Sequence, residues 1–279
     1  MIRNYLFETN ALKVSDHTQP FWYASNTFGP FFINTHYLFG SETQAKDFLK
    51  YIDDNASQKE KAPILFRDKV SQQYQNNGIF KDVIDQLVES IEDTVNVSQI
   101  DYISGGERRD WFFSYMVAVL LDKPHITVFK DLYSNVLVGE RVEETPDLSG
   151  KRVIHVCDLV TLASSYLKSW IPALKKHSGK LLETFTVVDR CQGGKEILQE
   201  EGIQLISLVN IDENLFTAAK EQSIINQEQF DMVLSFMKDL EKFMNEYIRE
   251  NPDFLSKSLQ KGGKDQERAE AFQENFYKR

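Results

Sequence analysis

A strand that ends in an acidic residue and leads into a hydroxyl-rich loop is the feature that most constrains this chain. The segment reads Lys151-Arg-Val-Ile-His-Val-Cys-Asp-Leu-Val-Thr-Leu-Ala-Ser-Ser165. Its apolar run predicts an inner strand that delivers Asp158 to its carboxyl end, where ligands of open α/β sheets usually bind. A carboxylate there can accept hydrogen bonds from vicinal ribose hydroxyls. The loop can offer amides and hydroxyls to a phosphate at the start of the next helix.

The same segment resembles the signature of the type I phosphoribosyltransferases. That signature has four apolar residues, two acidic residues, two apolar residues and then Thr-x-Gly-x-Ser/Thr. The chain supplies residues 153–156, Cys157-Asp158, Leu159-Val160 and residues 161–165. Cys157 stands in place of the first acid and Ala163 in place of the loop glycine. Taken alone, such a degenerate motif also fits an ordinary buried strand that enters a helix.

Two further segments make the resemblance closest to the orotate phosphoribosyltransferases. Residues 187–203, with Asp189-Arg190 and Gly193-Gly194, look like that family's Asp-Arg-x-x-Gly-Gly segment, and Ser207-Leu208 follows as expected. Residues 21–34 are similar to the N-terminal hood that covers the base in those enzymes. The resemblance implies an α/β fold with a mainly parallel sheet flanked by helices. It also implies a hood at residues 1–40 and an α/β domain at 41–211. The helical pattern beyond that domain predicts a C-terminal helical extension at 212–279, which is not a standard part of the resembled enzymes.

Hydrophobic periodicity predicts the same alternation of elements. Helices are predicted at residues 41–54, with Ser41 as N-cap, from residue 68, and at 80–91, 111–121, 166–177 and 194–201. Strands are predicted at residues 95–104, 124–130, 153–156, 182–188 and 204–208. Such alternation implies right-handed crossovers and a parallel sheet. An apolar stripe from Phe230 to Tyr247 predicts one long helix ended by Pro252, which either packs in the core or forms a partner interface. The tail from Lys257 is expected to be loosely held.

Composition narrows the class of protein further. The chain has 279 residues, 42% of them hydrophobic, and a net charge of −10, which opposes nucleic-acid binding through a general basic surface. No apolar run is long enough to predict a membrane span. Two cysteines and no signal-peptide pattern favour a cytoplasmic location.

The resemblance implies a site that binds 5-phosphoribosyl 1-pyrophosphate, with Mg²⁺ bridged through the substrate rather than bound directly by protein ligands, and a homodimer. The implied catalytic residues are Asp158, on the ribose, and Lys130, on the pyrophosphate. The implied ligand-binding residues are Thr161, Leu162, Ala163, Ser164 and Ser165 on the 5-phosphate, Gly105, Gly106, Arg108 and Arg109 on the pyrophosphate, and Phe32 and Arg190 on the base.

Several of these residues also have plain structural interpretations. Arg108 and Arg109 could form solvated ion pairs with Glu107 or Asp110, and Arg190 could pair with Asp189 or Glu196. Cys157 could be a small buried residue at a strand end. In the segment that resembles the family's catalytic loop, Phe129, Tyr133 and Asn135 occupy the positions of an arginine, a lysine and a histidine.

Three functions therefore remain open from the sequence. The chain could be a phosphoribosyltransferase with altered or reduced activity. It could be a non-catalytic module that binds a nucleotide or phosphoribosyl ligand, or a fold used only for assembly, because a fold does not determine a function.

Overall fold

The computed structural model describes residues 1–16, 18–23 and 25–276, with side chains described up to residue 274. The chain forms two compact units. The first contains Met1–Ala11 and Thr35–Asp212, and the second contains Leu12–Asn34 and Glu213–Arg279. The second unit therefore joins most of the N-terminal segment to the C-terminal helices, which the sequence pattern treats as separate parts.

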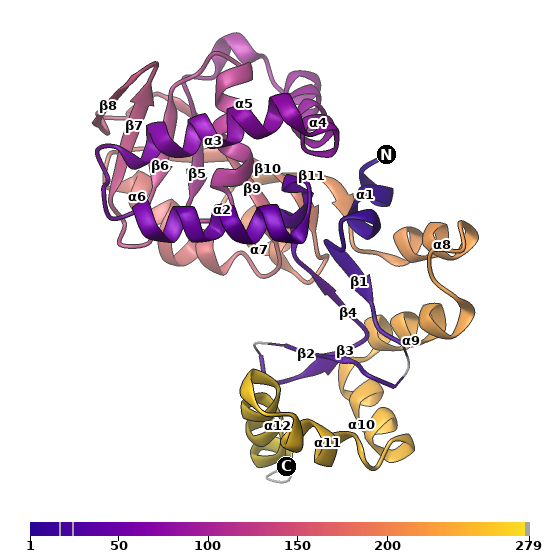
Figure 1. Cartoon of the computed structure of the whole chain (residues 1–279). Coiled ribbons are helices and arrows are strands. Elements are labelled where there is room, and N and C mark those ends of the chain that lie inside the picture. The colour runs from indigo at the N-terminus through magenta and orange to yellow at the C-terminus, as the bar shows by residue number, and fades with distance from the viewer. Residues whose placement is uncertain (17, 24, 277–279) are drawn as a thin grey trace. The chain divides into compact units, whose positions relative to one another are not determined.

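A seven-stranded sheet forms the centre of the first unit (Figure 1), in the order β11-β10-β9-β5-β6-β7-β8. Strands β5, β6, β9, β10 and β11 are parallel, and β7 and β8 are added antiparallel at one edge. The strands span Tyr102–Gly106 (β5), His125–Val128 (β6), Ser134–Val138 (β7), Arg141–Glu144 (β8), Arg152–Val160 (β9), Lys180–Asp189 (β10) and Gln204–Asn210 (β11). The predicted mainly parallel α/β sheet is confirmed.

Helices cover this sheet and complete the first unit. They are α1 (Ile2–Glu8), η1 (Thr35–Phe39), α2 (Glu42–Asn55), α3 (Ala62–Asn76), α4 (Gly78–Thr94), η2 (Val97–Gln99), α5 (Trp111–Leu120), η3 (Tyr166–Trp170), α6 (Ile171–Lys175) and α7 (Gly194–Glu200). The predicted cap of α2 is confirmed, since Ser41 accepts a hydrogen bond from the Gln44 backbone N–H. Helix α3 begins at Ala62, ahead of the predicted start, because Pro63 fits the first turn of a helix.

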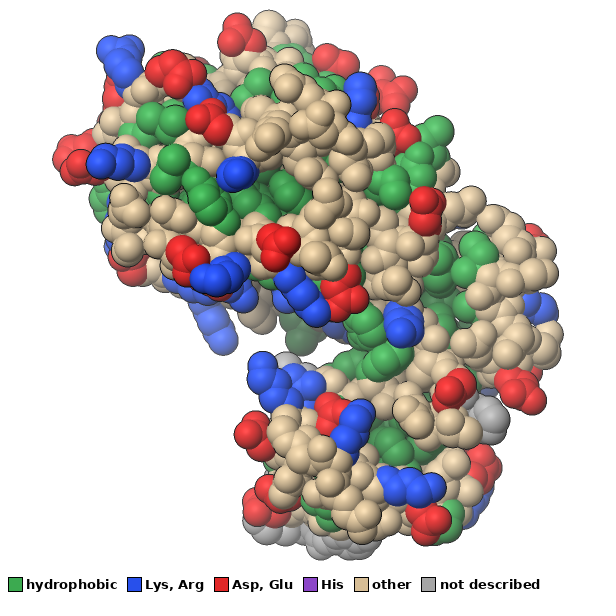
Figure 2. All heavy atoms as spheres, in the orientation of Figure 1, with side chains coloured by type: hydrophobic (Ala, Val, Ile, Leu, Met, Phe, Trp, Pro, Cys, Tyr) green, Lys and Arg blue, Asp and Glu red, His purple; other side chains and the backbone are tan. Residues whose placement is uncertain are grey.

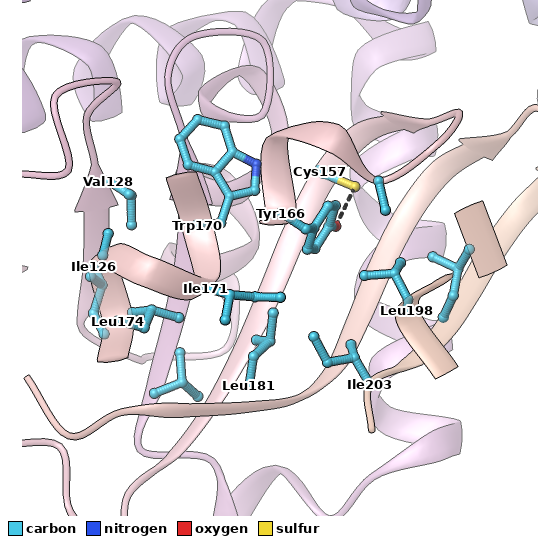
Figure 3. Close-up of a cluster of buried hydrophobic side chains, with 14 of the residues drawn as sticks. Ile126, Val128, Cys157, Tyr166, Trp170, Ile171, Leu174, Leu181, Leu198 and Ile203 are labelled. Carbon is cyan, nitrogen blue, oxygen red and sulfur yellow. Dashed lines mark hydrogen bonds between the residues drawn. The ribbon is translucent and has the colours of Figure 1, made fainter. Parts of the chain in front are cut away.

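One face of the sheet packs on η3, α6 and α7 (Figure 3). Its core joins Cys157 of β9 to Tyr166 and Trp170 of η3, Leu174 of α6 and Leu198 of α7. Because successive side chains of a strand point to opposite faces, the buried Ile154 and Val156 lie on the other side, where α5 contacts β5 and β9. Both faces are therefore buried, as expected for a parallel sheet.

The second unit is built around aromatic side chains. Its hairpin strands are β1 (Leu12–Val14), β2 (Phe21–Trp22), β3 (Phe28–Gly29) and β4 (Phe31–Ile33), and its helices are α8 (Glu213–Glu221), α9 (Gln227–Lys238), α10 (Leu240–Glu250), α11 (Phe254–Lys261) and α12 (Gly263–Phe276). The Phe28 ring contacts Trp22 of β2, Tyr247 of α10, Phe254 of α11 and Phe272 of α12.

Three sequence expectations need correction. The apolar stripe forms two helices rather than one, because Asp239 is extended and caps α10 by accepting a hydrogen bond from the Lys242 backbone N–H. The tail from Lys257 forms helices with buried Ala269 and Phe272, so the described part of the tail is packed. The strand expected over residues 95–104 starts only at Tyr102.

Among the described residues, no helix combines the length and the apolar character needed to cross a bilayer. On the face shown in Figure 2, acidic and basic side chains are interspersed rather than gathered into one basic surface.

Replacing Gly106 tests the packing of β5 against η3. A Cβ atom at this position would overlap the indole ring of Trp170, whereas a Cβ at Gly78 would meet nothing within 4 Å. We expect Gly106→Ala to lower the free energy of unfolding by about 1–3 kcal/mol, as overpacking does. The matched variant Gly78→Ala should leave it unchanged or raise it by up to about 1 kcal/mol, since alanine favours helices. Urea unfolding measures both, and equal effects would contradict this packing.

Candidate functional site

A pocket of about 480 Å³ lies in the first unit, where β5 and β9 end. Its lining comes from the segment after β5, the end of β9 with the following loop, and η3. Lys130, in the connection between β6 and β7, also lines the pocket. The lining residues are Glu107, Arg108, Arg109, Asp110, Lys130, Cys157, Asp158, Leu159, Val160, Thr161, Leu162, Ala163, Ser164, Ser165, Tyr166 and Trp170. The pocket thus unites Asp158, the loop at residues 161–165, both arginines and Lys130, as the sequence predicts.

Asp158 is the most strongly perturbed carboxyl group of the pocket. Its residue is only 6% exposed, and its Oδ2 atom has no hydrogen-bond partner among the described residues. Burial, followed by the negative charge of Asp110, raises its pKa to about 7, although Arg109 opposes this shift. A buried carboxyl group with a raised pKa and one oxygen atom without a partner is typical of a functional site when it borders a pocket.

The loop after β9 keeps a backbone conformation that favours glycine. Ala163 has a φ of 51°, in the left-handed region, and its side chain is buried. An alanine there costs on the order of 1–2 kcal/mol, so the loop retains the shape that a glycine would adopt without strain. Leu162 is 52% exposed and borders the pocket rather than filling the core.

The Gly193-Gly194 pair supports this loop from below. A Cβ at Gly194 would lie 2.6 Å from Val160 Cγ1 and 2.7 Å from the Thr161 carbonyl oxygen. The Arg190 backbone N–H also donates to the Val160 carbonyl, at 2.9 Å. The segment that resembles Asp-Arg-x-x-Gly-Gly therefore packs against the loop and fixes its backbone. Of the residues that the structure describes, Arg190 is not part of the pocket lining.

The pocket cations differ in how they are engaged. Arg108 forms an ion pair with Asp53 of α2, rather than with Glu107 or Asp110. The Lys130 ammonium lies 3.8 Å from a Glu107 carboxylate oxygen and is mostly exposed. Within the described part of the chain, Arg109 makes no ion pair within 4.0 Å. Arg109 is thus the cation most available to an anionic ligand.

Gly105 and Gly106 lie within β5 and are not part of the pocket lining among the described residues. The space beside them is taken by Ser114 and Trp170, so packing explains why glycine is needed at both positions. Phe32 lies in β4 of the second unit, where its ring makes an edge contact with Phe21, 4.7 Å between centroids.

The segment that resembles the catalytic loop forms the tight connection between β6 and β7. Phe129 is 2% exposed and packs edge-on against Trp111. Asn135 is 1% exposed, and its Nδ2 donates to the Lys59 carbonyl at 2.7 Å. Both side chains are therefore fixed in the fold and cannot reach a ligand.

Three residues that the sequence pattern did not single out as functional also shape the site. Asp110 accepts hydrogen bonds from the Gly106 and Asp158 backbone N–H groups, at 3.1 and 3.3 Å. His155, counted within an apolar run, is fully buried with Nε2 3.3 Å from Asp110 Oδ2. Trp170 lines the pocket from η3. A histidine inside a buried strand was the signal available in the sequence, because buried polar groups need partners.

Cys157 is the small buried residue that the structural interpretation expects. It receives a hydrogen bond from the Tyr166 hydroxyl at 3.0 Å (Figure 3), and burial raises the pKa of its thiol. The structure groups no three His, Cys, Asp or Glu side chains as a metal site among the described residues. The donor set, carboxylates beside hydroxyls, suits a hard cation that a ligand carries. The prediction of substrate-bridged Mg²⁺ stays a prediction.

Solved structures define the class of protein. The fold resembles the orotate phosphoribosyltransferase from Aeropyrum pernix, with a TM-score of 0.52 and 19% identity over 80% of this chain and 99% of that one. It also resembles the orotate phosphoribosyltransferase of Francisella tularensis, with a TM-score of 0.56 and 16% identity over 85% and 98%. The chain therefore has the type I phosphoribosyltransferase fold.

Sequence relatives identify the family. The orotate phosphoribosyltransferase of Sulfolobus acidocaldarius is 31% identical over 150 residues, 53% of this chain and 73% of that protein. The one of Saccharolobus solfataricus is 26% identical over 187 residues, 64% and 91%. No family model matches the chain. With the motifs above, these relatives show that the chain belongs to the orotate phosphoribosyltransferase family.

Asp158→Asn should make stability less dependent on pH. The pKa of Asp158 is raised from 3.8 to about 7, so between these values the folded protein holds a proton that the unfolded chain has lost. Wild-type stability therefore falls as pH rises through this window, and an asparagine does not titrate. We expect Asp158→Asn to exceed the wild type in unfolding free energy at pH 8 by about 1–4 kcal/mol, and by less at pH 5. Urea unfolding at both pH values measures this difference, and a variant no more stable relative to wild type at pH 8 than at pH 5 would contradict it.

Proposed function

We propose that the pocket binds a phosphoribosyl ligand, either 5-phosphoribosyl 1-pyrophosphate or a nucleotide, and that the chain is a phosphoribosyltransferase of altered or reduced activity. One observation carries this proposal. A buried carboxyl group with one oxygen atom that lacks a partner, a hydroxyl-bearing loop and an available arginine border the same pocket. Family membership supports the same ligand class.

Each part of the pocket suits one part of that ligand. The Asp158 carboxyl group would accept hydrogen bonds from the ribose hydroxyls, and Thr161, Ser164 and Ser165 would meet the 5-phosphate. Arg109, with Lys130 beside it, would meet the pyrophosphate, because guanidinium groups bind such oxygens in a bidentate manner. Contact of Phe32 and Arg190 with the base, and a homodimeric assembly, remain parts of the proposal.

Transfer of phosphoribose depends mainly on position and charge. The protein would hold the sugar so that a base nitrogen reaches C1 and would stabilise the charge that gathers on the departing pyrophosphate. Bound Mg²⁺ would supply further charge stabilisation on the pyrophosphate. Arg109 and Lys130 are the chain's own groups for that charge, and Arg108 is already held by Asp53.

A second candidate function is non-catalytic binding. The observation that favours it is the packed segment between β6 and β7, where Phe129 and Asn135 are buried and add no cation to the pocket. A protein of this kind would retain the ligand without accelerating transfer, and its additional helices would offer surface to a partner.

Calorimetric titration tests the shared part of both candidates. Asp158→Asn should reduce the preference for ribose 5-phosphate over inorganic phosphate by about tenfold, because hydrogen bonds to a charged acceptor are lost while the phosphate contacts remain. Using this ratio cancels changes that affect both ligands alike. An unchanged preference would contradict the assignment of Asp158 to the ribose.

Pyrophosphate release then separates the two candidates. We expect wild-type protein with 5-phosphoribosyl 1-pyrophosphate, Mg²⁺ and a panel of bases to release pyrophosphate only when a base is present, at a low rate. Tight binding without any base-dependent release would select the non-catalytic module.

A further inference from the structure

A buried pair of carboxyl groups lies at the floor of the pocket, formed by Asp110 and Asp158. Asp110 follows the end of β5 and Asp158 stands near the end of β9, and these strands are neighbours in the sheet. The Asp110 Oδ1 atom accepts the Asp158 backbone N–H at 3.3 Å, and Oδ2 accepts the Gly106 N–H at 3.1 Å. Asp110 thereby connects the segment that contains Arg109 to the strand that contains Asp158.

His155 contacts the Asp110 carboxyl group of this pair. Its Nε2 lies 3.3 Å from Asp110 Oδ2, and its Nδ1 lies 2.9 Å from the Ser104 hydroxyl. The ring is fully buried and packs against the rings of Tyr166 and Trp170. The position of the Asp110 carboxyl group is therefore defined by backbone donors and by a fixed imidazole.

We propose that Asp110 is a positioning residue that shares one proton with Asp158, and that an anionic phosphoribosyl ligand binds best while the pair holds that proton. This inference rests on the proposed function and extends it to the conditions under which the pocket accepts its ligand. Two ionised carboxylates in one buried site repel each other, and the charge of Asp110 accordingly adds to burial in raising the pKa of Asp158.

Three other titratable groups, His36, Cys157 and Tyr166, do not account for such a proton near neutral pH. Burial, followed by the charges of Arg109 and Arg108, lowers the pKa of His36 to about 3, so its imidazole is neutral. Burial raises the pKa of the Cys157 thiol and of the Tyr166 phenol, so both are neutral as well.

The fixed charges near the pair partly cancel. Arg108 is paired with Asp53, and Lys130 lies beside Glu107. Arg109 remains as the cation that lowers the pKa of Asp158, while burial and Asp110 raise it to about 7. A doubly ionised pair would leave this part of the pocket negative. The proposal requires the repulsion of a phosphate dianion by that second charge to exceed the gain from the stronger hydrogen bonds that an ionised Asp158 offers to the sugar.

Binding of ribose 5-phosphate between pH 6 and pH 8, without divalent cations, tests this inference by calorimetry. We expect Asp110→Asn to bind about tenfold more tightly than wild type at pH 8 and equally tightly at pH 6, because asparagine removes the second negative charge. A residue with a merely structural role would lose affinity at both values. Arg109→Gln should bind ribose 5-phosphate more weakly than wild type. Its affinity should begin to fall at a higher pH, because Arg109 lowers the pKa of Asp158.

A third variant assigns the proton within the cluster. His155→Gln keeps a side-chain N–H near Asp110 but cannot titrate, so the wild-type pH dependence should persist. Its disappearance would place the proton on the imidazole and overturn the proposal. If Asp110→Asn does not fold, the direction of the Arg109→Gln shift decides, and a shift to lower pH or none overturns it.

The outcomes also separate this inference from the function on which it rests. Failure of ribose 5-phosphate to bind wild type at any pH would sink the proposed function. Binding with the same pH course in wild type and Asp110→Asn would leave that function standing and sink the shared proton.

Discussion

The site depends on two carboxyl groups that the sheet brings together below the surface. Strand order places β9 beside β5, so Asp158 and Asp110 meet at adjacent strand ends. Burying an unpaired charge in a protein costs roughly several kcal/mol, unless the group becomes neutral by taking up a proton. The raised pKa of Asp158 expresses that cost. A buried carboxyl group with a raised pKa that borders a pocket is typical of a functional site.

Close packing around glycines holds the rest of the pocket in place. Trp170 fills the space beside Gly106, and the loop after β9 rests directly on Gly194. The loop itself accepts strain at Ala163, whose backbone is left-handed. Strain of this kind persists where surrounding structure fixes the chain, and here the loop keeps a backbone that favours glycine although residue 163 is an alanine. The pocket is therefore shaped in advance of any ligand.

The sequence predicted the sheet and the residues that follow β9, because the hydrophobic periodicity of each strand and the motif after β9 both lie along continuous segments of the chain. It placed Asp158, the loop residues, Arg109 and Lys130 at one site, and the pocket lining brings them together. It missed Asp110 and His155 as site residues. Their roles arise from contacts between residues that lie 45 and 48 positions apart in the sequence, which no local pattern reports. It also missed the helix break at Asp239, where an extended capping residue overrides an unbroken apolar stripe.

Charge balance links the carboxyl pair to the question of catalysis. Of the three pocket cations, Arg108 is held by Asp53 and the charge of Lys130 is partly offset by Glu107. The buried side chains of Phe129 and Asn135 supply no further cation. An anionic ligand therefore needs additional positive charge, from a metal ion that it carries or from the proton of the pair. Either source allows binding, whereas transfer also requires charge stabilisation on the leaving pyrophosphate. Binding and catalysis thus make different demands on the same pocket, and its residues include more of the groups that we propose for binding than of those that transfer requires.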